Sequence, residues 1–253
     1  MGPKPSELLC GSDTSTPSVC SYLDPDRRAL YAHSRAVARV RQDNEFCTAW
    51  LWGSEGHIMT AFSCAGELDS AKSASTLIIE FDAESFQCEN DIGCPSITSL
   101  VGAATFVHAN ETLGYSLLQL NASIATSILA KYGYLQASAT DIELKTGTHV
   151  YVPGQSPTSC KHIAFTDPFG HPAAITESHV PTTLLDARSR GAPVLAKATN
   201  LVIGQHYCDG IACANAGIEI ARIMADLERV GRLPANARVS SAGVPANVPA
   251  SVG

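Results

Sequence analysis

The chain has 253 residues and carries 24 acidic against 17 basic side chains, which gives a formal net charge of −7 at pH 7. A nucleic-acid-binding protein needs a basic stripe to displace counterions, and the longest Lys/Arg run here is Arg27-Arg28. Nucleic-acid and anionic-membrane partners are therefore not expected. Apolar residues make up 45% of the chain and charged residues 16%, a composition that can bury a core. No apolar run approaches the ~18 residues that a membrane-spanning helix requires.

Most of the chain is predicted to form short strands, because apolar stretches alternate with turn residues. In chain order these strands span residues 36–40, 48–52, 57–61, 76–81, 116–120, 148–152, 193–196 and 201–205. Apolar residues then recur at helical spacing from Ile220 to Val230, and Gly231 follows as a stop, which predicts one amphipathic helix. Residues 231–253 are predicted to be a flexible tail, since 233–253 are mostly Ala, Val, Ser and Pro. This order indicates antiparallel barrels or sandwiches.

Nine cysteines are spread along the chain without a Cys-x-x-Cys pair or a Cys/His cluster at zinc spacing, so we expect no metal and no cofactor. Scattered cysteines indicate disulfides made in an oxidising compartment and predict a secreted, extracellular protein. Two sequons, at Asn110 and Asn121, agree with secretion and are candidate glycosylation sites. The start, Met1 to Ser6, lacks the apolar stretch of a signal peptide, so a mature form is expected.

The clearest local unit is a hairpin that runs from Cys47 to Cys64. Two apolar strands flank the turn Gly53-Ser54-Glu55-Gly56, so the two cysteines come out opposite each other. The geometry of the hairpin predicts a disulfide between Cys47 and Cys64.

This hairpin resembles the histidine-bearing hairpin of trypsin-like serine proteases, in which a Thr-Ala-Ala-His-Cys ending is bridged Cys to Cys. Four further segments look like protease motifs in the same order: the aspartate strand, the opening of the second barrel, the nucleophile loop and the strand after it. They are Leu113–Leu120, Lys131–Tyr134, Arg188–Val194 and Val202–Gln205. The start of the chain is similar to the lysyl endopeptidase group, which has two cysteines ahead of an Arg-rich segment.

The resemblance covers most of residues 7–230 and implies an all-β, chymotrypsin-like chain of two six-stranded antiparallel β-barrels with a C-terminal α-helix. The first barrel and the N-terminal segment would span 7–120, and the second barrel with the helix 121–230, ahead of the tail 231–253. The resemblance also implies two bridges besides Cys47–Cys64, each contributing about 2–4 kcal/mol. These are Cys10–Cys213 and Cys20–Cys88. Cys94, Cys160 and Cys208 lie outside this pattern, which allows one further bridge and one free thiol.

The three positions that carry the catalytic triad in this family hold other residues here. Hydrolysis requires a histidine base, a carboxylate that orients it, and a serine nucleophile. The matching positions are Ser63, Gly114 and Arg190. The glycine two places before the nucleophile is Arg188, so amides aimed at an oxyanion are not expected. The acidic residue that sets lysine preference has no counterpart after Cys213, and the specificity pocket is expected to be lost.

Substitute catalytic residues are conceivable. Ser189 is a candidate displaced nucleophile, one residue out of register between two arginines. Candidate replacement bases are the histidines at 57, 108, 162, 171, 179 and 206. Proton transfer requires a base within hydrogen-bond reach of the nucleophile, and no motif supplies that positioning.

The sequence therefore predicts a secreted protease homologue that is not an enzyme and that binds another protein, such as a host or target enzyme, as a decoy, inhibitor or effector. One alternative is an active serine endopeptidase with rearranged catalytic residues. Another is a site for small anions or acidic peptides at Arg188 and Arg190. These two arginines also fit a solvated loop with no ligand.

Overall fold

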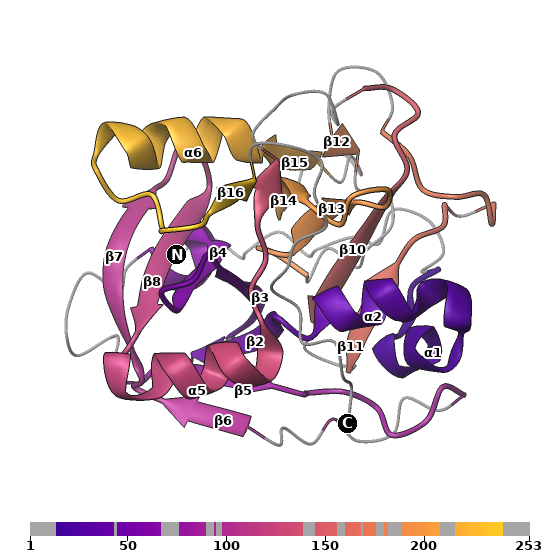
Figure 1. The fold of residues 1–253 in the computed structure, drawn as a ribbon, viewed down its shortest axis with the longest axis horizontal. Helices are drawn as coiled ribbons and strands as arrows, with labels where there is room; N and C mark the ends of the chain where they lie inside the picture. Colours follow the sequence, from indigo (N-terminus) through magenta and orange to yellow (C-terminus); the bar gives the residue numbers. More distant parts are fainter. Residues whose placement is uncertain are drawn as a thin grey trace, which may run out of the picture.

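A computed structural model describes residues 14–42, 45–66, 76–89, 94, 98–138, 145–155, 160–167, 169–175, 180–181, 189–207 and 216–239. These residues form two sheets, one from each half of the chain, that lie side by side (Figure 1). The indigo-to-magenta strands make up the first sheet, and the orange strands make up most of the second. In this part of the chain, no helix is long and apolar enough to cross a membrane.

The first sheet contains seven strands among the described residues, in the order β6-β5-β2-β3-β4-β8-β7. Their bounds are β2 (Val37–Gln42), β3 (Glu45–Trp52), β4 (His57–Ala61), β5 (Ile78–Phe81), β6 (Thr98–Val101), β7 (Ala104–Asn110) and β8 (Tyr115–Leu120). Strand β4 pairs with β3 on one side and with β8 on the other, and all five of its residues are buried. The short helix α3 (Phe62–Ala65) follows β4 directly.

The second sheet contains nine strands in the described part, with the main order β1-β11-β10-β13-β14-β15-β12. Their bounds are β1 (Thr16–Pro17), β10 (Val150–Gln155), β11 (Lys161–Ala164), β12 (Val180–Pro181), β13 (Pro193–Ala196), β14 (Val202–Tyr207) and β15 (Ala216–Glu219). Two further strands, β9 (Ala137–Ser138) and β16 (Arg238–Val239), pair with each other, and β9 also pairs with β14. The predicted all-β, two-barrel architecture is confirmed, although the described residues form seven strands in the first sheet and nine in the second, where short strands such as β1 and β16 add to the number.

Among the described residues, five helical segments accompany α3. They are α1 (Ser18–Leu23), the 3-10 helix η1 (Pro25–Arg27), α2 (Arg28–Ser34), α5 (Ala122–Tyr132) and α6 (Ile220–Arg229). Helix α6 confirms the predicted C-terminal helix. Helix α5 was not predicted, because its sequence is rich in Ala, Ser, Thr and Ile and carries a single charge, Lys131, so its buried face does not stand out.

The N-terminal segment packs on the second barrel, whereas the sequence grouped it with the first. Strand β1 pairs with β11, with Thr16 opposite Ile163, and both α1 and α2 contact β11. One hydrophobic cluster then spans the two barrels, with Trp50, Trp52 and Tyr151 fully buried in it. A second cluster, which includes Val152 and Val194, lies within the second sheet, so the barrels share part of their interior and the second also has a core of its own.

Three disulfides brace the described part of the chain. Cys47–Cys64 and Cys20–Cys88 were both predicted and are confirmed. The third joins Cys94 to Cys160, a choice that the sequence left open. Beside it, the fully buried Lys161 of β11 donates to Glu84 Oε1 at 2.9 Å, so an ion pair also crosses between the barrels. Cys10, Cys208 and Cys213 lie outside the described residues, so the predicted bridge Cys10–Cys213 stays a prediction.

The predicted tail is packed at least as far as Val239. The indole N–H of Trp52 donates to Ala237 O at 2.8 Å, and the amide of Ala137 donates to the same oxygen at 2.7 Å. Ala237 is 1% exposed, and Arg238 and Val239 pair with β9. Because Trp52 belongs to the first barrel and Ala137 to the second sheet, residues 233–239 bind the two halves together.

We expect a chain that ends at Arg232 to have a free energy of unfolding about 2–4 kcal/mol lower than the full chain. The truncation removes the acceptor of two buried N–H donors, each worth about 1–3 kcal/mol when left unsatisfied. Urea unfolding followed by tryptophan fluorescence measures the difference. A chain that ends at Val239 is the matched control and keeps Ala237. Equal losses in the two truncations would show that residues 233–239 do not bind the halves together.

Candidate functional site

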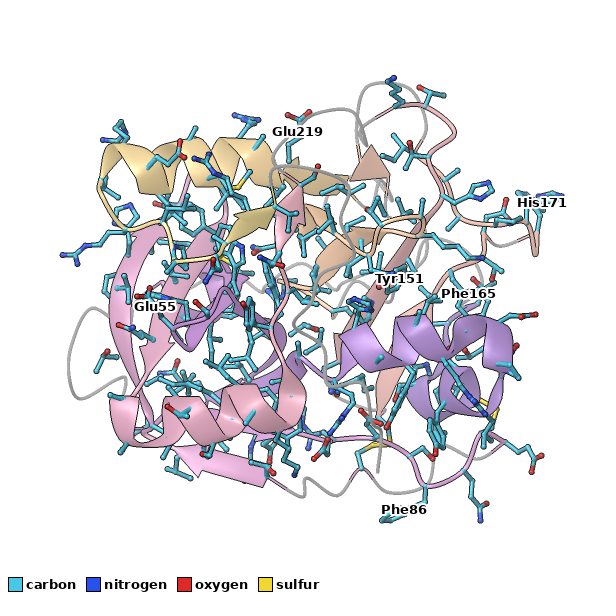
Figure 2. The ribbon with its side chains drawn as sticks, viewed as in Figure 1. Glu55, Phe86, Tyr151, Phe165, His171 and Glu219 are labelled. Carbon is cyan, nitrogen blue, oxygen red and sulfur yellow. A yellow bond between two sulfur atoms is a disulfide. The ribbon has the colours of Figure 1, made fainter. Side chains whose placement is uncertain are left out.

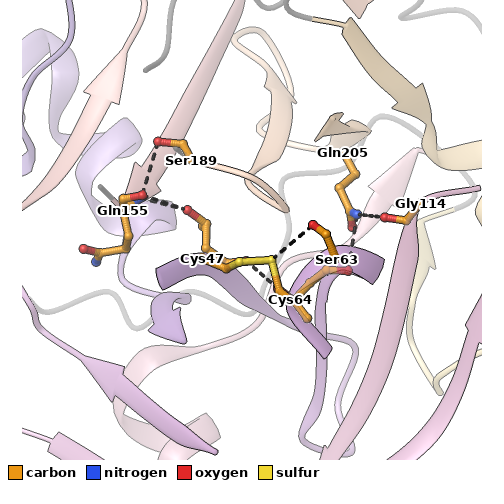
Figure 3. Close-up of a disulfide and its surroundings, with 9 residues drawn as sticks. Cys47, Ser63, Cys64, Gly114, Gln155, Ser189 and Gln205 are labelled. Atoms are coloured by element: carbon orange, nitrogen blue, oxygen red, sulfur yellow. Dashed lines mark hydrogen bonds between the residues drawn. A yellow bond between two sulfur atoms is a disulfide. The ribbon is translucent and has the colours of Figure 1, made fainter. Parts of the chain in front are cut away.

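Two of the three predicted triad positions meet where β4 ends. Ser63 lies in α3, is exposed, and its Oγ is 3.8 Å from Cys64 Sγ (Figure 3). Gly114 lies in the turn between β7 and β8 and is buried. The amide of Phe62 donates to Gly114 O at 2.9 Å, so the histidine and aspartate positions are neighbours.

The third position, Arg190, reaches the same region through its backbone. Thr48 N–H of β3 donates to Arg190 O at 2.9 Å. A Cβ added to the next residue, Gly191, would lie 2.6 Å from both Ala61 N and Thr48 O. The structure therefore brings the three predicted positions together at the junction of the barrels. Arg188 lies outside the described residues, so the candidate anion site formed by Arg188 and Arg190 stays a prediction.

A carboxamide, and not a carboxylate, is the polar side chain beside Gly114. Gln205 Nε2 on β14 donates to Gly114 O and to Thr60 O, each at 3.3 Å (Figure 3). Gln205 is 1% exposed, and its Oε1 accepts no hydrogen bond. Gly114 also has a φ of +63°, a backbone conformation that most side chains resist. This role of Gln205 could not be predicted from the sequence, because residues 114 and 205 meet only in the fold.

The candidate nucleophile Ser189 is closed off from solvent. Its side chain is 3% exposed, and its hydroxyl donates to Gln155 O at 3.3 Å. The amide of Gln155 in turn donates to Thr48 Oγ1 at 2.9 Å. Ser189 is thus part of a polar chain that joins β10 to β3 across the junction, as Figure 3 shows on the side opposite Gln205.

Five of the six candidate histidines fall within the described residues, and none hydrogen-bonds the hydroxyl of Ser63 or Ser189 there. Burial lowers the pKa of His206 to about 4, which leaves its ring neutral. Burial also lowers the pKa of His57, an effect that Glu55 opposes. His171 is exposed at the outer edge of the second barrel, 3.2 Å from Asp167 (Figure 2). His179 lies outside the described residues.

The remaining two histidines do have polar neighbours. His108 Nε2 is 3.6 Å from Asp226 Oδ2, and His162 Nδ1 is 2.9 Å from Ser15 Oγ. Ser15 and His162 lie where β1 meets β11, at the edge of the second sheet. That edge is two strands away from β13, so this pair is separate from the junction.

A buried carboxylate that the sequence did not single out ties α6 to the β7–β8 hairpin. Asp226 Oδ2 accepts from Tyr115 Oη at 2.8 Å and from Asn110 Nδ2 at 2.9 Å, while Oδ1 accepts from Arg229 at 2.6 Å. Burial alone would raise the pKa of Asp226, but these donors hold it well below the usual range of a carboxyl. Its spacing was a usable signal, because Asp226 falls three residues after the buried Ile223, inside the apolar arc.

Comparisons with known proteins fit this geometry. No family model matches the chain. The chain is 31% identical over 245 residues to the secreted RxLR effector protein 73 of Plasmopara viticola, a match that covers 91% of this chain and 58% of that protein. The chain thus spans a little over half of this relative's length.

Solved protease structures superpose on both barrels. The match to Glu endopeptidase has a TM-score of 0.56 at 13% identity and covers 89% of this chain and 99% of that one. This is the trypsin-like fold. A serine endoprotease from Yersinia pestis also matches, with a TM-score of 0.55 at 11% identity, over 83% of this chain and 69% of that one. Rv3671c from M. tuberculosis, in an inactive form, matches with a TM-score of 0.51 at 14% identity, over 88% and 97%.

Replacing Asp226 with Asn should destabilise the protein by about 2 kcal/mol near pH 6, because the charge that receives three donors is lost. The pKa of Asp226 is depressed in the folded state, so its contribution is complete above the unfolded pKa of about 3.9 and declines as the pH falls below it. The gap between wild type and Asp226→Asn should therefore narrow at pH 3.

Urea unfolding of both proteins at pH 6 and pH 3 measures this gap. Glu228→Gln is the matched control, since Glu228 lies two residues away and forms an exposed pair with Arg238. An undiminished gap at pH 3 would mean that the Asp226 charge does not hold the helix.

Proposed function

We propose that this chain is a secreted, catalytically inactive homologue of the trypsin-like serine proteases, most similar to the lysyl endopeptidase group, and that it binds another protein. One observation carries the proposal. Ser63, Gly114 and Arg190 meet at the barrel junction, at the positions that would hold the base, the carboxylate and the nucleophile.

Each of these residues lacks the chemistry that hydrolysis needs. A serine hydroxyl at 63 cannot take a proton near neutral pH, glycine at 114 has no side chain, and a guanidinium at 190 is neither a nucleophile nor a base. Ser189, the adjacent hydroxyl, is buried and already donates its hydrogen bond to Gln155. These observations support the loss of catalysis.

The binding role is supported by what the chain keeps. Three disulfides and a shared core hold the scaffold, so surface loops can engage a partner without any reaction. The relative from Plasmopara viticola is named a secreted effector, which favours secretion and a target in another organism. A host protein, such as an enzyme, is the partner that this combination favours.

We expect no hydrolysis of Lys, Arg or Phe peptide substrates by the purified protein, and no recovery in the triple variant Ser63→His, Gly114→Asp, Arg190→Ser. Triad residues act as a unit, and the new aspartate would sit at a φ of +63° against the Gln205 carboxamide. Arg188 would still replace the oxyanion-loop glycine, and a missing oxyanion donor costs about a hundredfold or more in turnover. Fluorogenic peptide hydrolysis measures both proteins.

Ser189→Ala, purified in parallel, separates intrinsic activity from a contaminating protease. Turnover by the wild type that disappears in Ser189→Ala would overturn the proposal, whereas turnover that persists equally in Ser189→Ala, Ser15→Ala and His162→Ala marks contamination.

A rearranged active hydrolase is the second candidate, and the Ser15–His162 contact favours it. The 2.9 Å separation between Ser15 Oγ and His162 Nδ1 is within reach for proton transfer. Activity that is lost in both Ser15→Ala and His162→Ala but kept in Thr14→Ala would establish this candidate in place of the binding module.

A further inference from the structure

The two sequons lie at opposite ends of the β7–β8 hairpin. Asn110 is the last residue of β7 and pairs with Tyr115, the first residue of β8, beside Gly114. Asn121 directly follows Leu120, the last residue of β8. Asn121 is seven positions after Gly114, which is about 23 Å along an extended strand. Figure 1 shows the same arrangement, with α6 at one end of β8 and α5 at the other.

Both polar atoms of the Asn110 carboxamide form hydrogen bonds within the protein. Its Nδ2 donates to Asp226 Oδ2 at 2.9 Å, and its Oδ1 accepts from Leu113 N–H at 3.1 Å. The side chain is half-buried between the hairpin and α6. A sugar on Nδ2 would replace one N–H and push a bulky group against this helix, so it conflicts with the folded state.

The backbone of Asn121 is held by hydrogen bonds, whereas its side chain is exposed to solvent. Its N–H donates to Ala103 O at 2.8 Å, and its own carbonyl accepts from Ile124 and Ala125 at the start of α5. Its side chain makes no capping hydrogen bond, and both Asn121 and Ser123 of the sequon are exposed. The carboxamide is thus presented to solvent from a rigid position.

A cavity of about 400 Å³ lies directly beside Asn121. It is bounded by β8, α5 and the β3–β4 turn, and polar groups of Glu55, Thr105, Gln119 and Thr126 line it. Its volume is within the range of small-molecule sites. Gln119 Nε2 already donates to Glu55 O and Thr105 Oγ1 to Gln119 O, so the lining offers mainly acceptor oxygens and the Thr126 hydroxyl. These match the hydroxyls and the acetamide N–H of an N-acetylhexosamine.

We propose that Asn121 carries an N-linked glycan whose first N-acetylglucosamine lies in this cavity, while Asn110 stays unmodified in the folded protein. The arrangement places the attachment residue about 23 Å along the strand from Gly114 at the junction of the barrels. The junction of the barrels then stays accessible to a partner, whereas a glycan on Asn110 would lie beside Gly114. The proposal stands independently of whether the junction binds or cuts a protein.

Secretion of the full chain from a eukaryotic host, followed by glycopeptide mapping of the folded monomer, tests the site. We expect occupancy at Asn121, complete loss of glycan in Asn121→Gln, and an unchanged glycan mass in Asn110→Gln. Asn110→Gln should also lower the Tm by about 3–10 °C, since it breaks the contact with Asp226. A glycan on Asn110 of the folded monomer, or an empty Asn121, would overturn the assignment.

The cavity is tested separately by trimming the glycan to one N-acetylglucosamine with an endoglycosidase. We expect the trimmed protein to keep the Tm of the full glycoform and to exceed that of Asn121→Gln. Thr126→Val, which removes a polar group of the lining, should reduce this gain. A trimmed protein with the same Tm as Asn121→Gln would show that the sugar does not use the cavity.

Discussion

The two barrels meet through a backbone contact that only glycine allows. Gly191 has a φ of +86°, and a Cβ there would lie 2.6 Å from both Thr48 O and Ala61 N. This close approach lets Arg190 O accept the amide of Thr48 on β3, while Gly191 N–H donates to His206 O on β14. The segment Arg190–Gly191 is thereby hydrogen-bonded to both sheets, and these bonds hold one barrel in place relative to the other.

The polar groups around this contact form hydrogen bonds across the junction of the barrels. Thr60 Oγ1 donates to Thr48 O, Ser189 donates to Gln155 O, and Gln205 spans Thr60 and Gly114. Each bond satisfies a buried group that would otherwise weaken the interface. Two further contacts join parts of the fold away from the junction. Asp226 holds α6 to the β7–β8 hairpin, and residues 233–239 contact Trp52 through Ala237. The scaffold therefore depends on contacts that need no catalytic residue.

Elements whose own residues carry a clear apolar or turn pattern were predicted from the sequence. The strands expected at 57–61 and 193–196 coincide with β4 and β13, and the hairpin disulfide follows from strand geometry. Features made by distant residues were not predictable. The Cys94–Cys160 bridge, the Trp52 bond to Ala237 and the Gln205 carboxamide beside Gly114 each join positions more than 60 residues apart. Residues 233–239 of the predicted tail were misassigned for the same reason, because their order comes from Trp52 and β9 and not from their own composition.

The most direct test of the account is covalent labelling of the native protein with a phosphonate probe that bonds only to an activated serine, followed by intact mass measurement. A serine becomes reactive when a positioned base removes its proton. In the described part of the chain no histidine hydrogen-bonds Ser63, and Ser189 is buried. We expect the mass of the native protein to remain unchanged under conditions that fully label an active trypsin-like protease. A single adduct mapped to Ser63, Ser189 or Ser15 would contradict the account and identify a working nucleophile.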